Sequence, residues 1–225
     1  MGPKKKYKST SSSYTFDKGL SIYLIIVESP SKCSKIESYL GQNYKCIASK
    51  GHIRELTGLK NIDIKNGFQP NFTLIKEKQS HVQEMKKIIK QYPKHNVILA
   101  TDDDREGEGI AWHICELFDL SIKTTPRILF HEITKKALND AVNAPTKIDI
   151  HLVKAQQARQ ILDILVGFKI SPHLWKHVYS SKDKSLSAGR CQTPALRLIY
   201  DNFQEKKNIT PEKTYKTHGL FTERD

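Results

Sequence analysis

One stretch of the chain restricts its fold more than any other. The segment Val97–Phe118 reads VILATDDDREGEGIAWHICELF. It begins with four consecutive apolar residues, a pattern typical of a strand that is buried on both faces. Its second half places apolar residues at helical spacing. The segment therefore predicts a buried strand, a tight acidic turn and a helix, which together favour an α/β sheet.

The turn between this strand and this helix carries acids on alternate residues, at Asp102, Asp104 and Glu106. Carboxylates so close together repel one another unless a cation offsets their charge. A hard divalent cation with oxygen ligands, Mg²⁺ above all, meets that need. The turn follows the carboxyl end of the predicted strand, and open α/β sheets bind their ligands at the carboxyl ends of their strands. We therefore predict a magnesium site rather than a solvated acidic cap, the other use of acids at a helix N-terminus.

The pattern D-x-D-x-E-G also occurs in calcium-binding EF-hands, but two features exclude that interpretation. A predicted strand, and not a helix, precedes the acids. The position at which a bidentate glutamate should close the calcium loop is occupied by His113. A magnesium site on an α/β sheet explains the segment better.

Other parts of the chain complete the sheet. Apolar runs predict strands at Ile22–Val27 and Tyr44–Ser49, and amphipathic spacing predicts a helix at Ser80–Tyr92. Ser29 and Pro30 suit the start of a helix that ends before Gly41. Alternating strands and helices of this kind indicate a parallel sheet covered on both faces.

After the central segment, the sequence predicts mainly helices. We expect a fourth strand at Arg127–Phe130, a helix from Thr134, and then helices at 148–166, from Ser171-Pro172, and at 191–204. The predicted organisation is a disordered tail at 1–20, an α/β domain at 21–145, and the start of a mainly helical domain at 146–225 that is incomplete at its C-terminal end.

The composition narrows the range of possible functions. A net charge of +13 points to a polyanionic partner, and nucleic acid is the first candidate. No apolar run approaches the ~20 residues of a membrane helix, so we expect no membrane partner. The four cysteines are scattered without a C-x-x-C pair, which fits a reducing compartment. An intracellular, DNA-associated location follows.

The tail has almost nothing to bury, which predicts disorder. Its basic run, Lys4–Lys8, allows three interpretations: a nuclear-import signal, a phosphate-binding arm or a solubilising tail. The expected location is accordingly the cytoplasm and nucleoid, with the nucleus as the alternative if the run is an import signal.

Three further residues are candidates for chemistry. Glu28 follows the first strand, and on a strand adjacent to the acidic turn it becomes a fourth carboxylate of the same site. Lys32 lies one turn into the next helix, from which its ammonium can reach that space. His52 follows Gly51 and is flanked by Lys50 and Arg54, a combination that suits a phosphate-facing loop.

Five motifs, taken in order, resemble one family. They are Ile25–Lys32 (IIVESPSK), Gly51–Ile53 (GHI), Ala100–Glu108 (ATDDDREGE), Ala155–Arg159 (AQQAR) and Leu186–Gln192 (LSAGRCQ). Together they resemble the type IA DNA topoisomerases, in particular the bacterial topoisomerase I branch. The first three belong to that family's TOPRIM domain, a Rossmann-like parallel sheet with helices on both faces, and the last two to the helical domain that follows it. The resemblance covers about Ser21–Glu205.

The resemblance implies a reaction. The family cuts one DNA strand through a tyrosine to form a 5′-phosphotyrosine, passes another strand through the gap and reseals it, relaxing negative supercoils without ATP. It implies that Glu28 is a metal ligand or proton carrier and that Lys32 stabilises the transition state or protonates the leaving 3′ oxygen. Asp102, Asp104 and Glu106 correspond to the Mg²⁺-binding triad, and Arg105 within that motif is assigned a catalytic role. A metal and a cation both offset charge on a transferring phosphoryl group.

The resemblance also implies a set of DNA-binding residues. Aromatic and basic side chains together suit single-stranded DNA, whose bases stack and whose phosphates pair with cations. For Trp175, a place in the core is an equal alternative. The family usually has arginines where this chain has Gln160 and Ile164, which would weaken its hold on phosphates. The implied residues are His52, Arg159, Gln160, Asp163, Phe168, Trp175, Ser187, Ala188, Gly189, Arg190, Cys191 and Gln192.

The family's nucleophilic tyrosine is followed by proline, arginine and threonine. None of the nine tyrosines has that context. We therefore expect a monomer that binds Mg²⁺ and single-stranded or negatively supercoiled DNA but does not cleave it by itself. Two alternatives stay open: another TOPRIM enzyme such as a primase or a nuclease, and a non-catalytic remnant that binds single-stranded DNA.

Overall fold

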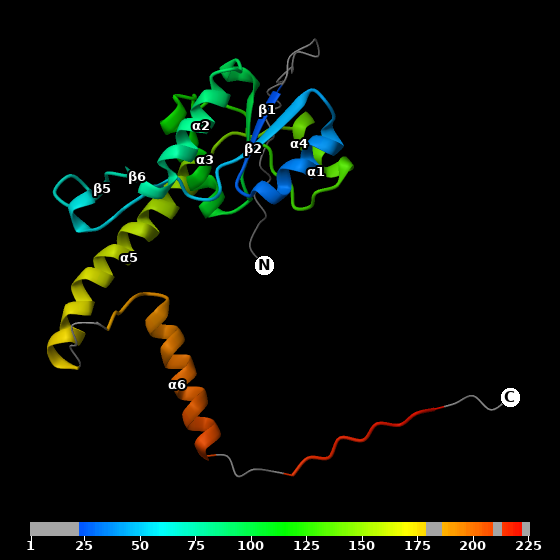
Figure 1. Ribbon diagram of the computed structural model, residues 1–225. Helices are drawn as coiled ribbons and strands as arrows, with labels where there is room; N and C mark the ends of the chain where they lie inside the picture. Colours follow the sequence, from blue (N-terminus) through cyan, green and yellow to red (C-terminus); the bar gives the residue numbers. More distant parts are fainter. Residues whose placement is uncertain (1–22, 179–185, 209–212, 222–225) are drawn as a thin grey trace, which may run out of the picture. The chain divides into compact units, whose positions relative to one another are not determined.

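The computed structural model describes residues 23–178, 186–208 and 213–221 (Figure 1). The chain divides into two compact units, of which the first ends at Ile164 and the second begins at Leu165. This division falls within helix α5 (Ile150–His177), whereas the sequence predicts a domain boundary after residue 145, before that helix. The predicted disordered tail at 1–20 lies outside the described residues.

The first unit is built on a parallel sheet of three strands in the order β2-β1-β7. The strands are β1 (Tyr23–Val27), β2 (Tyr44–Ala48) and β7 (Val97–Ala100), and every residue of β1 and β7 is buried. Val27, the last residue of β1, is in register with the last residue of each neighbour. The residues that follow the strands therefore meet at one edge, and the predicted α/β fold is confirmed.

Helices cover both faces of this sheet (Figure 1). Leu24 and Ile26 of β1 pack with α2 (Gln79–Ile89) and α3 (Arg105–Phe118). The alternate residues of β1 point the other way and pack with α1 (Pro30–Leu40) and α4 (Lys135–Asn143). Since successive strand side chains point to opposite faces, a continuous apolar run supplies both layers of the core.

The segment between β2 and α2 contains only short strands and single helical turns. It holds two short antiparallel pairs, β3 with β6 and β4 with β5, and one turn of 3₁₀ helix lies between β3 and β4. The bounds are β3 Arg54–Glu55, β4 Ile62–Asp63, β5 Gln69–Pro70 and β6 Thr73–Leu74, with 3₁₀ turns at Leu59–Asn61, Lys76–Lys78 and, before β7, Lys94–Asn96.

Two elements of the structure differ from those that the sequence predicts. The predicted strand Arg127–Phe130 is reduced to isolated bridges from Arg127 to Leu99 and to Thr146. Because β7 ends at Ala100 and turns into the acidic loop, the chain beyond residue 128 has no strand to continue pairing with. The helix expected to begin at Ser171-Pro172 is instead the last part of α5, which contains Pro172. The proline removes one helical hydrogen bond, but Ser171 Oγ accepts a bond of 3.0 Å from the Ala188 N–H, which fixes this part of the helix.

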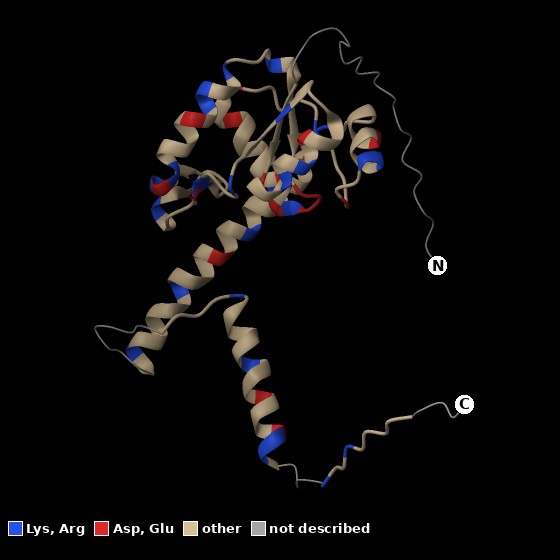
Figure 2. Cartoon of the chain, turned by 45° about the vertical axis from the view of Figure 1, so that its right-hand side comes forward, with Lys and Arg blue, Asp and Glu red and all other residues tan. Residues whose placement is uncertain are grey.

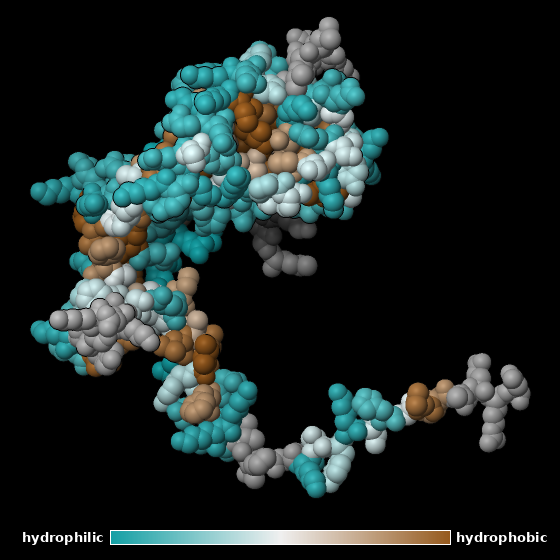
Figure 3. Space-filling model, viewed as in Figure 1, coloured by the Kyte–Doolittle hydropathy of each residue, from teal (hydrophilic) through white to brown (hydrophobic). Residues whose placement is uncertain are grey.

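The second unit contains the end of α5 and helix α6 (Gln192–Asn208). Large apolar or aromatic side chains of α6 are exposed, and Figure 3 shows brown patches among the hydrophilic surface of that helix. They are Leu196, Leu198, Ile199, Tyr200 and Phe203. Among the described residues, no helix combines the length and the apolar character that crossing a membrane requires.

Candidate metal and nucleic-acid site

Three of the predicted site residues meet at the carboxyl edge of the sheet. Glu28 directly follows β1, and its Oε1 accepts a hydrogen bond of 2.9 Å from the Asp102 N–H. The ammonium of Lys32, in the first turn of α1, forms an ion pair with Asp102 Oδ1. The parallel register therefore places a carboxylate from each of two strands beside one lysine.

The charges at this edge are incompletely balanced. Burial raises the pKa of Glu28, and the neighbouring carboxylates Asp102 and Asp104 raise it further. The hydrogen bond from the Asp102 N–H and the charge of Lys32 act in the opposite direction. Oxygen donors with excess negative charge suit a hard divalent cation, so the chemistry of these side chains is compatible with a divalent metal.

Asp104 and Gly107 fix the shape of the acidic loop. Asp104 is the N-cap of α3, and its side chain accepts a bond of 2.7 Å from the Gly107 N–H. A Cβ atom added at Gly107 would lie 2.1 Å from the Asp102 carbonyl oxygen. Only glycine allows the first turn of α3 to pack this closely against the loop, which explains the glycine that follows the acids.

Glu106 contacts residues of other segments. Its carboxylate lies 3.3 Å from His52 Nε2, 3.0 Å from Gln156 Nε2 and 3.1 Å from Arg159 Nη1. These donors come from the β2–β3 loop and from α5. Among the described residues, no three His, Cys, Asp or Glu side chains converge closely enough to hold a metal ion. The predicted triad is thus divided: Asp102 and Asp104 lie near Glu28, and Glu106 faces predicted DNA-binding residues.

The loop after β2 directs His52 toward Glu106. Lys50 and Gly51 both have positive φ angles, of 60° and 85°, which turn the chain sharply at the end of the strand. The His52 Nδ1 atom is buried and has no hydrogen-bond partner among the described residues.

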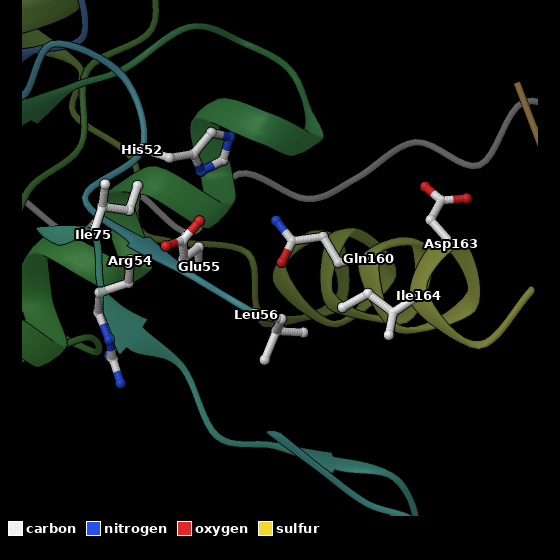
Figure 4. A pocket seen from close by; sticks show the side chains of 8 residues that line it. All are labelled: His52, Arg54, Glu55, Leu56, Ile75, Gln160, Asp163 and Ile164. Atoms are coloured by element: carbon white, nitrogen blue, oxygen red, sulfur yellow. The ribbon is translucent and has the colours of Figure 1, made fainter. Parts of the chain in front are cut away.

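A cavity of about 380 Å³ opens beside His52 (Figure 4). Three predicted DNA-binding residues contribute to it from two separate elements: His52 from the loop, and Gln160 and Asp163 from α5. Arg159 forms an ion pair of 3.9 Å with Asp163. The structure therefore gathers part of the predicted DNA-binding set around one hollow, which is lined by His52, Arg54, Glu55, Leu56, Ile75, Gln160, Asp163 and Ile164.

Other predicted DNA-binding residues lie in the second unit. Phe168 and Trp175 are both exposed, and the Trp175 indole N–H donates to the Leu186 carbonyl. Trp175 is therefore not a core residue. In the segment 187–192, Ala188 is buried, whereas Ser187, Arg190, Cys191 and Gln192 are exposed and Gly189 is half-buried. Internal hydrogen bonds shape this segment at the start of α6, from Gly189 N–H to Thr193 Oγ1 and from Gln192 Nε2 to Ser187 Oγ.

Two protein families match successive parts of the chain. A Toprim domain matches residues 23–133, and a DNA topoisomerase domain matches residues 147–225. The solved structure of full-length topoisomerase I from Thermotoga maritima is similar, with a TM-score of 0.70 and 40% identity over 84% of this chain. The chain belongs to the type IA topoisomerase family. It spans 31% of the length of the Thermotoga chain.

Toprim domains generally bind a divalent metal. Nothing in these similarities supports the nuclear location that the sequence left open. Figure 2 shows acidic and basic residues mixed over the visible side of the first unit. On that side, basic residues are not gathered into one face.

Sequence reasoning missed three buried polar residues of this chain, Glu108, Arg127 and Gln156. Glu108 and Arg127 form an ion pair, and Gln156 bonds to Glu106. Glu108 was visible only as one more acid in the motif. Arg127 is the single cation at the start of an apolar run. That position suggests burial, and a buried arginine requires a buried acid as its partner. The predicted catalytic residue Arg105 is exposed at the start of α3.

Proposed function

We propose that this chain is the metal- and DNA-binding part of a type IA topoisomerase. The whole enzyme would relax negatively supercoiled DNA by cutting one strand transiently, passing another strand and resealing the break without ATP. The observation that carries this proposal is the meeting of Glu28, Lys32 and Asp102 at the carboxyl edge of a Toprim sheet. This edge lies in the same compact unit as the cavity lined by His52, Gln160 and Asp163.

Glu28, Asp102 and Asp104 would hold the cation, which we take to be Mg²⁺ because all the donors are hard oxygens. When bound, Mg²⁺ offsets the charge that builds on the transferring phosphoryl group. Lys32 is placed to stabilise the same charge or to protonate the leaving 3′ oxygen. Glu28, whose pKa is raised by burial, is suited to carry a proton at this position.

Glu106 links this acidic loop to the DNA. Its three partners include His52 and Arg159, which we propose as phosphate contacts. A DNA phosphate would compete with Glu106 for both groups and free its carboxylate for the metal. Binding of DNA and binding of Mg²⁺ would then favour each other, because such coupling is reciprocal.

The proposed cleavage reaction needs a nucleophilic tyrosine. No tyrosine of this sequence is followed by proline, arginine and threonine. We propose that the chain binds DNA as a monomer without cutting it, and that cleavage requires a tyrosine that another part of the enzyme supplies. A Tyr-Pro-Arg-Thr segment encoded downstream in the same gene would support this division of labour.

The topoisomerase proposal is favoured over a primase or a nuclease that shares the Toprim domain. The observation that favours it is the match of residues 147–225 to a DNA topoisomerase domain. A remnant that binds single-stranded DNA without any catalytic partner would have the same DNA affinity. Only the presence of the downstream tyrosine segment separates it from the enzyme.

The proposal is tested with this chain and a fluorescent single-stranded oligonucleotide. Anisotropy should show binding that is tighter with Mg²⁺ than with EDTA and that weakens as salt rises. Arg159→Ala should weaken it, whereas Lys94→Ala, a control on an exposed ion pair with Asp119, should not. A denaturing gel should show no nicked product. Absence of binding in low salt, or cleavage by the chain alone, would contradict the proposal.

A further inference from the structure

A buried ion pair lies beneath the acidic loop. Arg127 Nη2 and Glu108 Oε2 are 2.7 Å apart, and their side chains are only 1% and 5% exposed. Removing two charges from water costs several kcal/mol per ion, and the attraction between them often fails to repay it. Such a pair is therefore weak evidence of stabilisation, and a positional role explains it better.

Arg127 also holds the loop itself. Its Nη2 donates a second hydrogen bond, of 3.0 Å, to the Asp102 carbonyl oxygen. The Arg127 backbone is fixed in turn by paired bonds with Thr146, of 3.0 and 2.6 Å, and by the bridge to Leu99. The guanidinium thus extends from a rigid part of the sheet edge to the backbone of the loop.

The backbone of Asp102 is consequently restrained on three sides. Its N–H donates to Glu28, its carbonyl accepts from Arg127, and Gly107 packs against it without a Cβ. These contacts set the direction in which the Asp102 carboxylate points. Of the three, only the contact with Arg127 brings a full positive charge beneath the loop.

Glu108 connects the same pair to the DNA-facing helix. Its other carboxylate oxygen accepts a bond of 2.6 Å from the Asp149 N–H, immediately before α5 begins at Ile150. The first part of α5 carries Gln156 and Arg159, which contact Glu106. The pair therefore joins the acidic loop, the sheet edge and the start of α5 within the first unit.

We propose that Glu108 and Arg127 are a positioning pair for the metal site. Arg127 fixes the Asp102 peptide so that its carboxylate is oriented for the cation, and Glu108 neutralises Arg127 so that the cation is not repelled. This proposal rests on the proposed function only in taking Asp102 as a metal ligand. Groups that orient metal ligands in this way typically change metal affinity by about 10- to 100-fold when they are removed.

The test compares the chain with its Arg127→Lys and Glu108→Gln variants. Arg127→Lys keeps the charge, but its shorter side chain ends in an ammonium that cannot take the position of Nη2, the atom that contacts both Glu108 and the Asp102 carbonyl. Glu108→Gln removes only the neutralising charge and is nearly the same size. Calorimetry should show Mg²⁺ affinity about 10- to 100-fold weaker in each. Hydrogen exchange should show faster exchange over residues 101–107, with residues 23–27 unchanged.

Met85→Ala is the matched control. Met85 is a buried core residue of α2, so the substitution lowers the unfolding midpoint without touching the pair. It should leave Mg²⁺ affinity and the exchange of residues 101–107 unchanged. A control that weakened Mg²⁺ binding as much as Arg127→Lys would show that lost stability is sufficient and would overturn the positioning role.

Two other results are decisive. Wild-type Mg²⁺ affinity and exchange in both variants would overturn the positioning pair. If the unmodified chain bound no Mg²⁺, the proposed metal site would fail, and the exchange of residues 101–107 would still test the pair by itself. Should Arg127→Lys not fold, Glu108→Gln provides the same two measurements.

Discussion

The buried histidine of α3 makes the stability of the chain depend on pH. His113 is completely buried, and neither ring nitrogen has a hydrogen-bond partner among the described residues. Its ring packs edge-on against Phe72 and Trp112, with centroids 4.4 and 4.8 Å apart. Burial lowers its pKa from 6.5 to about 3, and the positive charges of Arg54 and His52 act in the same direction.

The size of the effect follows from the two pKa values of His113. Above pH 6.5 the histidine is neutral in both the folded and the unfolded chain, so it causes no difference. Below pH 6.5 the unfolded chain binds a proton that the folded chain cannot accept until the pH nears 3. Stability is therefore lost as pH falls through this window, by about 2 kcal/mol between pH 8 and pH 5.

Urea unfolding at pH 8 and pH 5 measures this loss. The chain has two tryptophans, so a Trp175→Phe background leaves Trp112, which touches the histidine, as the reporter. His113→Leu changes stability at both pH values, but the loss between them should be smaller by about 2 kcal/mol. Equal pH dependence with and without His113 would refute the assignment of a buried neutral histidine.

Three further outcomes are expected. Gly107→Ala places a Cβ 2.1 Å from the Asp102 carbonyl oxygen, and overpacking of about 1–3 kcal/mol should lower the melting temperature by roughly 2–12 °C in calorimetry. Lys32→Ala removes a cation that competes with Mg²⁺ for Asp102. Titration should therefore show Mg²⁺ affinity tightened by about 1.4- to 5-fold, which corresponds to the free energy of a partly exposed ion pair. Weakened affinity would contradict this. Single-stranded DNA should tighten Mg²⁺ binding, and Arg159→Ala should weaken that coupling, because Glu106 has then already lost one of the two partners for which DNA would compete; equal coupling in the variant would disprove it.

The sequence was sufficient for the parts of the fold that depend on continuous patterns. The runs Tyr23–Val27 and Val97–Ala100 are apolar at every position, which predicts strands buried on both faces, and both are. Because parallel strands end at a common edge, the sequence alone predicts that Glu28 and Asp102 lie close together. The approach of Lys32 follows from its place in the first turn of α1.

Contacts between distant segments could not be predicted in this way. The direction of Glu106 depends on α5, which lies about fifty residues later in the chain. Two partners there, Gln156 and Arg159, together with His52 of the β2–β3 loop, hold Glu106 away from the other two acids of the motif. Arg127 and Glu108 were missed because their pairing is visible only once the sheet edge and α3 are packed together. Pro172 was expected to start a helix, whereas tertiary contacts hold it inside one.

The most direct test of this account is Mg²⁺ binding by the chain itself. Isothermal titration calorimetry on the unmodified chain should show saturable binding, and Asp102→Asn combined with Asp104→Asn should remove it. Circular dichroism should confirm that the double variant keeps its secondary structure. Saturable binding in the unmodified chain that is lost in the folded double variant would support a metal site at the carboxyl edge of the sheet. Mg²⁺ binding that survives in the double variant would contradict it.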